Sequence, residues 1–291
     1  MSRLRISMRY VNLCGMNSTF KAACIQNTAG NDIDANIAWV CQRIDEAAAA
    51  GADFIALPET VGLIEPINDK IPALTFSEAD DKGLAAFREL ASKHQVCMLV
   101  GSQLIRRPDN RIVNRSFMLN RQGEIQARYD KLHLFDIQLA NGEAYLESEM
   151  ITPGEKAVIT DTPLGRFGLS VCYDLRFAAL YRALAQNGAQ ILTIPAAFTQ
   201  TTGKAHWHTL VIARAIETGS FVIAPNQCGH HGGKRYSFGH SLIVDPWGEV
   251  LADGGVEPGI IYADIDVSKV EQARSRIPAL QHDRVFTLDL Q

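Results

Sequence analysis

The stretch "GLSVCYDLRF", residues 168–177, decides the fold and raises the first question about function. Its small and apolar residues are typical of a buried strand, but the stretch turns polar directly after Cys172, with Asp174 and Arg176 close behind. A helix pattern follows over about 177–187. The sequence thus predicts a strand followed by a helix, with a thiol at the turn between them. Such a thiol is either an ordinary core cysteine or a nucleophile held at the turn.

The same alternation of apolar strands and helices continues on both sides of this stretch. Further helices are predicted over about 34–50, 78–94, 205–219 and 267–276. The predicted strands include "FKAACIQ" (20–26), "ADFIALPE" (52–59), "VCMLVGSQLI" (96–105), "QILTIPAAF" (190–198) and "FVIAPNQ" (221–227). Turn sequences such as "RQGE" and "PWGE" separate shorter strands and indicate hairpins.

Continuous apolar strands that alternate with helices indicate an α/β protein whose sheets are buried on both faces. The hairpins add antiparallel pairs, so we expect mixed sheets. No Ser/Gly/Pro-rich linker divides the chain, and we predict one domain over 19–291 in which two packed sheets lie between helices. Because the pattern begins only at Phe20, and Met16 would also serve as a start, residues 1–18 are predicted to be a disordered arm or an over-extended start.

The composition argues against several classes of partner. A net charge of −4 gives no electrostatic reason to expect nucleic acid or an anionic membrane. The longest apolar runs, such as 189–198, fall well short of the ~18–20 residues of a membrane span. The six cysteines are scattered singly without a CxxC pair, and the N-terminus lacks the apolar core of a secretory signal. These features predict a cytoplasmic protein in a reducing compartment.

Three of the predicted strands end in residues that can take part in catalysis. Glu59 ends "FIALPE", Lys131 ends "QARYDK" and Cys172 ends "FGLSVC". Each residue alone has an ordinary explanation, since a charged residue often marks the exit of a strand into water and many buried thiols are inert. In α/β sheets, however, ligands collect at the carboxyl ends of strands. The three side chains are therefore expected to share one site.

Together these groups form a complete set for acyl transfer. A thiol attacks as the thiolate, a nearby ammonium lowers its pKa, and a carboxylate within reach can take its proton. The ammonium of Lys131 can also stabilise the oxyanion of a tetrahedral intermediate. The backbone N–H of Tyr173, at the start of the following helix, is a second candidate donor.

Three motifs of the chain resemble the signatures of the nitrilase, or carbon–nitrogen hydrolase, superfamily. They are "LPE" (57–59), "YDKLHLFD" (129–136) and "VCYDLRF" (171–177), in the order found in that family. The resemblance extends from about Phe20 to Ile277. It implies an αββα sandwich without a metal or another cofactor. It also implies that Glu59 is the base, Lys131 the oxyanion-stabilising cation and Cys172 the nucleophile.

The resemblance implies a second glutamate after the lysine, which helps to position the catalytic groups. "AYLESE" offers Glu147 and Glu149, and the spacing in the Nit branch of the family points to Glu147. Glu147 could instead be a solvated loop carboxylate. By the same resemblance His133 is structural, a hydrogen-bonded side chain beneath Lys131.

Two other kinds of site are not favoured. "NQCGHHGG" and "AHWH" contain a group of possible zinc ligands, namely Cys228, His230, His231, His206 and His208. Their spacing fits no usual zinc pattern, and His206 and His208 would point to different faces of a helix. "GHHGGK" (229–234) is one residue short of a phosphate loop. We therefore expect no metal and no nucleotide site here.

The segments 195–208 and 214–231 resemble the Nit branch, particularly its deaminated-glutathione amidases. This resemblance implies cleavage of a linear amide of a 2-oxo dicarboxylic acid; omega-amidase, another aliphatic amidase or nitrilase, and a catalytically silent binding protein are the alternatives. A 2-oxo acid substrate needs donors for its carboxylate, and the candidates are Arg176 and groups near Phe198 and Thr199. Asp174 and Arg176 are expected mainly to fix the turn by local pairing. Apolar helix faces over 177–187 and 205–218 predict a homodimer or a higher oligomer, as in the family.

Overall fold

The computed structural model describes residues 19–139, 142 and 144–290. Two six-stranded sheets form the centre of the molecule. The predicted arm or over-extended start over residues 1–18 lies outside the described residues.

Each of the two sheets contains both parallel and antiparallel strand pairs, as the sequence predicts. The first sheet has the order β16-β1-β2-β3-β4-β5, formed by β1 (Thr19–Gln26), β2 (Phe54–Ala56), β3 (Cys97–Arg106), β4 (Ile112–Leu119), β5 (Ile125–Asp130) and β16 (Gly259–Asp266). In this sheet β1, β2 and β3 run parallel, and the other pairs are antiparallel.

The second sheet has the order β15-β14-β11-β10-β9-β8, formed by β8 (Val158–Thr162), β9 (Gly165–Leu169), β10 (Ile191–Thr193), β11 (Phe221–Ala224), β14 (Leu242–Val244) and β15 (Val250–Asp253). Here β9, β10 and β11 run parallel, and the remaining pairs are antiparallel. The parallel strands of both sheets are nearly fully buried, which explains why their sequences are apolar without alternation.

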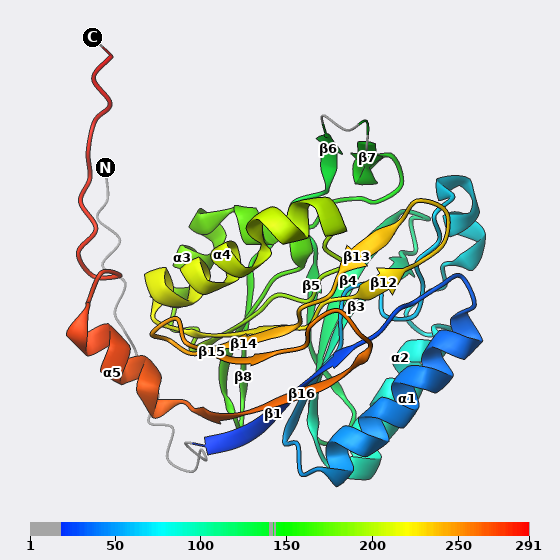
Figure 1. The fold of residues 1–291 in the computed structure, drawn as a ribbon, viewed down its shortest axis with the longest axis horizontal. Helices are drawn as coiled ribbons and strands as arrows, with labels where there is room; N and C mark the ends of the chain where they lie inside the picture. The colour runs from blue at the N-terminus through cyan, green and yellow to red at the C-terminus, as the bar shows by residue number, and fades with distance from the viewer. Residues whose placement is uncertain (1–18, 140–141, 143, 291) are drawn as a thin grey trace.

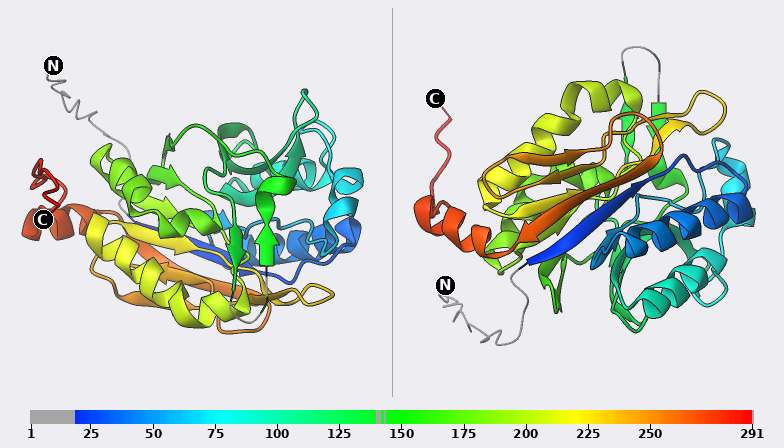
Figure 2. Two further views of the ribbon diagram at one scale, coloured as in Figure 1. Left: turned by 90° about the horizontal axis from the view of Figure 1, so that it is seen from above. Right: turned by 60° about the horizontal axis from the view of Figure 1, so that its bottom comes forward.

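Helices cover the outer face of each sheet, so the fold is the predicted αββα sandwich. Helices α1 (Ile33–Ala49) and α2 (Lys82–His94) lie on the first sheet, and α3 (Ala178–Gln186) and α4 (Gln200–Thr218) lie on the second. The two pairs lie on opposite sides of the sheets in Figure 1, and the turned views in Figure 2 show the same separation. The last helix, α5 (Ser268–Arg276), follows β16.

The two sheets share one hydrophobic core. Side chains of the first sheet, such as Phe54 and Leu99, belong to the same buried cluster as Phe167 and Leu192 of the second. The rings of Phe54 and Phe167 lie 4.9 Å apart between the sheets. Because neither sheet could bury its inner face alone, we propose that residues 19–291 form a single domain.

The helix ends are where the sequence prediction was least accurate. α2 begins at Lys82 because the Asp81 side chain accepts a hydrogen bond from the Leu84 amide, whereas the apolar pattern suggested a start near residue 78. α4 begins five residues earlier than expected, since Thr199 caps it. Several short elements were not predicted: the 3₁₀ helices η1 (Asn68–Leu74) and η2 (Glu147–Glu149), and the hairpins β6 (Asp136–Gln138) with β7 (Ala144–Leu146) and β12 (Cys228–His230) with β13 (Tyr236–Phe238).

Candidate active site

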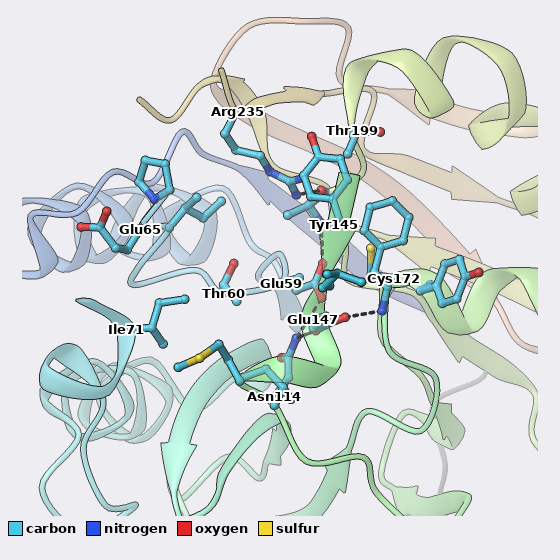
Figure 3. Close-up of a pocket in the computed structure, with 18 of the residues that line it drawn as sticks. Glu59, Thr60, Glu65, Ile71, Asn114, Tyr145, Glu147, Cys172, Thr199 and Arg235 are labelled. Atoms are coloured by element: carbon cyan, nitrogen blue, oxygen red, sulfur yellow. Dashed lines mark hydrogen bonds between the residues drawn. The ribbon is translucent and has the colours of Figure 1, made fainter. Parts of the chain in front are cut away.

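The three strand ends singled out in the sequence meet at one cavity. Glu59 follows β2, Lys131 follows β5 and Cys172 follows β9, so the first sheet supplies two of the residues and the second supplies one. All three line a cavity of about 690 Å³. Figure 3 shows Glu59 and Glu147 converging beside Cys172.

Glu59 is held by a close approach of two backbones. A Cβ atom on Gly101 would lie 1.9 Å from the Leu57 carbonyl oxygen, so only glycine lets β3 pass this near to the loop that carries Glu59. Ser102 fastens the same loop, because its amide donates to the Pro58 carbonyl and its hydroxyl accepts from the Thr60 amide. The loop that carries Glu59 is therefore fixed in position although it follows a strand of only three residues.

Lys131 lies between two carboxylates and is almost fully buried. Its Nζ atom is 2.9 Å from Glu59 Oε1 and 2.8 Å from Glu147 Oε2. Burial alone lowers the pKa of Lys131, but the charges of Glu147 and Glu59 outweigh it and hold the pKa well above its ordinary value. The same contacts with Lys131, together with hydrogen bonds from Cys172 and the Ala197 amide, outweigh burial at Glu59 and keep its pKa below the ordinary value. Glu59 and Lys131 are thus both ionised at neutral pH.

Glu147, and not Glu149, is brought to the lysine. Glu147 accepts hydrogen bonds from Lys131 and from the Phe135 amide at 2.7 Å, while Glu149 is exposed. Asn114 joins the two carboxylates, since its Nδ2 atom lies 2.9 Å from Glu59 Oε1 and 3.3 Å from Glu147 Oε1. Sequence reasoning missed Asn114, because an asparagine inside an apolar strand gives no sign of the carboxylates that it will meet.

Cys172 adopts an unusual backbone conformation at the strand-to-helix turn. Its φ angle is +49°, in the left-handed region that non-glycine residues seldom occupy. The turn is stabilised on both sides, because the Cys172 amide donates to the Pro195 carbonyl and the Val171 amide donates to the buried Asp174 carboxylate. Asp174 thus fixes the turn, as expected. Strained residues held in this way are common at functional sites.

The partners of Asp174 differ from the expected one, since they do not include Arg176. Its carboxylate accepts hydrogen bonds from the Tyr129 hydroxyl and from the backbone and ring nitrogens of His133. The His133 ring also stacks on Phe177 at 3.5 Å. His133 therefore has the structural position that the family resemblance implies.

The pKa of the Cys172 thiol is raised, whereas a nearby ammonium alone would be expected to lower it. Burial and then the negative charge of Glu59 raise the pKa of Cys172 well above its ordinary value, and the opposing effect of Lys131 is too small to reverse this. The cluster holds two carboxylates against one ammonium, so a thiolate would add a second excess negative charge. The resting site thus holds a neutral thiol beside an ionised carboxylate.

Of the four other candidate residues from the sequence, three line the cavity and one does not. Tyr173, Phe198 and Thr199 line it, but Tyr173 belongs to a 3₁₀ turn, η3 (Cys172–Arg176), rather than to the start of α3. Arg176 is not among the lining residues; its guanidinium packs over the rings of Tyr173 and Phe198 instead.

A cation that the sequence analysis missed does line the cavity. Arg235 donates to the Ala197 carbonyl at 2.6 Å and its guanidinium lies 5.1 Å from the centre of the Tyr145 ring. Among the described residues Arg235 forms no ion pair, and its side chain lines the cavity. Figure 3 shows Arg235 and Tyr145 on one side of the cavity, away from Asn114. The only sequence signal was its place directly after "GHHGGK" (229–234), the stretch that is one residue short of a phosphate loop.

Comparisons with known proteins agree with this site. The sequence profile of the carbon–nitrogen hydrolase family matches residues 21–275. The chain belongs to the carbon–nitrogen hydrolase family. One relative, described as deaminated glutathione amidase from Synechocystis sp., is 38% identical over 272 residues, which cover 92% of this chain and 98% of that protein.

Solved structures of other carbon–nitrogen hydrolases have the same fold. The NitFhit protein of C. elegans has a TM-score of 0.86 and 36% identity, over 91% of this chain and 65% of that one. A mutant amidase from Nesterenkonia sp. AN1, with a TM-score of 0.76 and 26% identity over 89% of this chain and 94% of that one, shows covalent addition of the acetamide moiety of fluoroacetamide at its active site cysteine.

This carbon–nitrogen hydrolase is therefore an enzyme that acts on amides. No helix within the described residues is both long and apolar enough to cross a membrane. The five described cysteines are all free thiols.

Proposed function

We propose that the protein is a thiol amidohydrolase that cleaves deaminated glutathione into 2-oxoglutarate and cysteinylglycine. The observation that carries the chemical part of this proposal is the buried contact between the Glu59 carboxylate, the Lys131 ammonium and the Cys172 thiol. Among the described residues that line the cavity, Cys172 is the only cysteine.

In the first step Glu59 takes the proton of the thiol as sulfur attacks the amide carbonyl. The raised pKa of the Cys172 thiol means that this transfer accompanies attack and does not precede it. Lys131 has three N–H donors, of which the two carboxylates need one each, so a third can stabilise the oxyanion. The backbone N–H of Tyr173 is the proposed second donor.

In the second step Glu59 returns the proton to the departing amine, and a thioester remains on Cys172. Water, deprotonated by the same carboxylate, then attacks the thioester and releases the carboxylic acid. The covalent addition of the acetamide moiety of fluoroacetamide to the active site cysteine of the mutant Nesterenkonia amidase supports a cysteine as the nucleophile.

The substrate assignment is supported by the lining of the cavity and by the relatives. A volume of about 690 Å³ lies near the middle of the range of ~300–1,000 Å³ for small-molecule sites, which leaves room for a substrate with a large leaving group. Arg235 supplies a cation for the carboxylate at the 2-oxo acid end, a role in which it replaces Arg176. Proteins described as deaminated glutathione amidase share 38% identity with the chain.

A side-by-side assay tests the proposal. Deaminated glutathione, 2-oxoglutaramate, glutamine and a simple nitrile are compared by kcat/KM, and we expect deaminated glutathione to be preferred by about a hundredfold, which is ~2.8 kcal/mol of transition-state discrimination. A preference for 2-oxoglutaramate would identify an omega-amidase, and preference for the nitrile a nitrilase. Turnover of none of them would reject this proposal in favour of a binding protein.

The nucleophile is tested separately with Cys172→Ala. This variant should fold normally and lose turnover of every amide, because no other thiol lines the described part of the cavity. Cys41→Ala, a half-buried cysteine of α1 that does not line the cavity, is the matched control and should keep full activity. Activity retained by Cys172→Ala would refute the assignment.

Two further features belong to the same proposal. We propose that the enzyme is a homodimer joined through α3 and α4, and that it works in the cytoplasm, where its free thiols stay reduced.

A further inference from the structure

A second cluster of chemically active side chains lies outside the catalytic cavity. His208 of α4, His240 in the connection between β13 and β14, and Asp253 at the end of β15 bring one ligand atom each to within 4.8 Å of one another. Within the part of the chain that the structure describes, no other group of three such residues meets this spacing. We propose that these three residues form a binding site for Zn²⁺.

The ligand set suits zinc in both type and spacing. Asp253 Oδ2 lies 3.0 Å from His208 Nε2, and Asp253 Oδ1 lies 2.8 Å from His240 Nδ1. Zinc bonds of about 2.0–2.1 Å at a tetrahedral centre place neighbouring ligand atoms about 3.3 Å apart, so each of these two pairs is within a few tenths of an ångström of the zinc spacing. The ligand nitrogens of the two histidines lie within 4.8 Å of each other and complete the set. Two imidazoles and one carboxylate favour Zn²⁺ over Mg²⁺ or Ca²⁺, which prefer oxygen ligands.

The backbone holds His240 in place for this role. Its φ angle of +54° is rare for a residue other than glycine. The conformation is maintained because the His240 carbonyl accepts a hydrogen bond from the Trp207 indole at 2.7 Å and its amide donates to the Gly255 carbonyl. Trp207 precedes His208 on α4, so this bond also fixes the separation of the two histidines.

The side chains around the cluster orient both rings. The Phe238 ring stacks on His240 at 4.5 Å and meets the edge of His208 at 6.0 Å. The Gly255 amide donates to Asp253 Oδ1 at 2.9 Å, which turns the carboxylate toward the histidines.

The cluster is open enough for an ion and a water molecule to reach it. The side chains of His208, His240 and Asp253 are 37%, 24% and 35% exposed. Three protein ligands leave a fourth position of the tetrahedron for water. A bound ion would join α4 to β15 and to the β13–β14 connection, three segments that are distant along the chain, and would stabilise the folded state by linkage.

The sequence could not reveal this site. His208 was considered as a ligand together with His206, Cys228, His230 and His231, and that grouping was rejected on its spacing. The actual partners of His208 lie 32 and 45 residues further along the chain, at positions that only the packing of α4 on the second sheet brings together.

Zinc titration of the untagged full-length protein tests the proposal. The titrations use a Cys172→Ala background, so that the catalytic thiol does not bind the metal, and competition with a chromophoric chelator gives the affinity. We expect one Zn²⁺ per chain, and a loss of affinity of at least tenfold in His208→Gln and in Asp253→Asn. His206→Gln, an exposed histidine on the same helix, is the matched control and should bind as the parent does.

A thermal-shift measurement tests the same site even in a variant whose free energy of unfolding is lowered by the substitution. The rise in melting temperature on adding Zn²⁺ is measured for each variant against its own metal-free sample. The parent and His206→Gln should show this rise, and Asp253→Asn should not; Mg²⁺ should have no effect on any of them. Equal zinc affinity in the parent and Asp253→Asn, or no binding by the parent, would overturn the proposal and leave a hydrogen-bonded His–Asp–His cluster.

Discussion

At the scale of single residues, the charge balance of the site explains how a buried thiol can react. Glu59 and Glu147 face one ammonium, that of Lys131, so the site already carries one excess negative charge. Under this condition the thiol of Cys172 stays protonated until an amide carbonyl is available to receive the electron pair. A neutral resting thiol also protects the cysteine from oxidation, since the thiolate is the reactive form.

The pH dependence of the enzyme should reflect this balance. The proposed mechanism requires ionised Glu59, whose pKa lies below its ordinary value of 4.5, so kcat/KM should fall only as pH drops below that value. Lys131 stays protonated beyond its ordinary pKa of 10.5. Its deprotonation should therefore not lower kcat/KM at any pH below that value. The measurement is a pH profile of kcat/KM over the range in which the protein remains folded.

Alkylation of the free enzyme provides an independent check on the thiol. The labelling rate of Cys172 by iodoacetamide should rise only above pH 9.0, because its pKa is raised above that ordinary value. If the labelling rate rose to half its maximum near neutral pH, the resting site would hold a Cys172 thiolate paired with the Lys131 ammonium, and not a neutral thiol.

Arg235 is the residue at which substrate recognition can be tested. Arg235→Gln should raise KM for deaminated glutathione by about 10- to 100-fold with a smaller change in kcat, because the lost contact is present in both the ground state and the transition state. Hydrolysis of an uncharged aliphatic amide should change little, which separates loss of carboxylate binding from damage to the site.

Arg176→Gln is the matched control for this experiment. Arg176 does not line the cavity, and its removal should leave KM for deaminated glutathione unchanged. The reverse outcome, with KM raised by Arg176→Gln and not by Arg235→Gln, would return the carboxylate site to the residue first considered from the sequence.

At the scale of elements, the proposed catalytic residues are positioned by contacts between strand ends. The loop after β2 bends sharply at Thr60, whose φ angle is +47°, and it is tied to β3 through Ser102. The register of β3 against β4 shifts between Val100 and Gln103, directly opposite this loop. The irregularity in β3 thus makes room for the loop that carries Glu59.

Substitution of Gly101 tests this close approach. Gly101→Ala should destabilise the protein by about 2 kcal/mol, since the new methyl group overlaps the Leu57 carbonyl. It should also lower kcat/KM by about a hundredfold if Glu59 moves by as little as an ångström. Chemical denaturation and steady-state kinetics measure the two effects.

Gly30→Ala is the control for this prediction. A Cβ atom at Gly30 would meet no atom within 4 Å, so stability should change by less than about 0.5 kcal/mol and activity should be unaffected. Equal behaviour of the two variants would mean that the close approach at Gly101 does not position Glu59.

At the scale of the whole molecule, the outer face of α3 bears on the oligomeric state. Ala178, Ala179 and Ala183 are exposed along this helix, and small apolar side chains allow close packing of another helix. Light scattering should therefore give a mass of at least twice the 32.0 kDa of the chain. Ala179→Arg should shift the protein toward the monomer, whereas Ala38→Arg, on an exposed position of α1, should not. A monomeric parent protein would contradict this prediction.

The sequence by itself determined the αββα architecture and three of the catalytic candidates. Both follow from short-range patterns: continuous apolar strands between amphipathic helices, and a glutamate, a lysine and a cysteine each placed at the end of such a strand. The family motifs around Glu59, Lys131 and Cys172 point to the same residues, and the register of the strands then brings them together.

Only the tertiary structure decided which polar side chains meet across the two sheets. Asn114 beside the carboxylates, Arg235 in the cavity and the His208–His240–Asp253 cluster all depend on contacts between segments far apart in the chain. The sign of the shift in the thiol pKa was also decided there, because it depends on burial and on the number of charges within a few ångströms. A sequence specifies local conformation, but electrostatic energies depend on distances that arise only after folding.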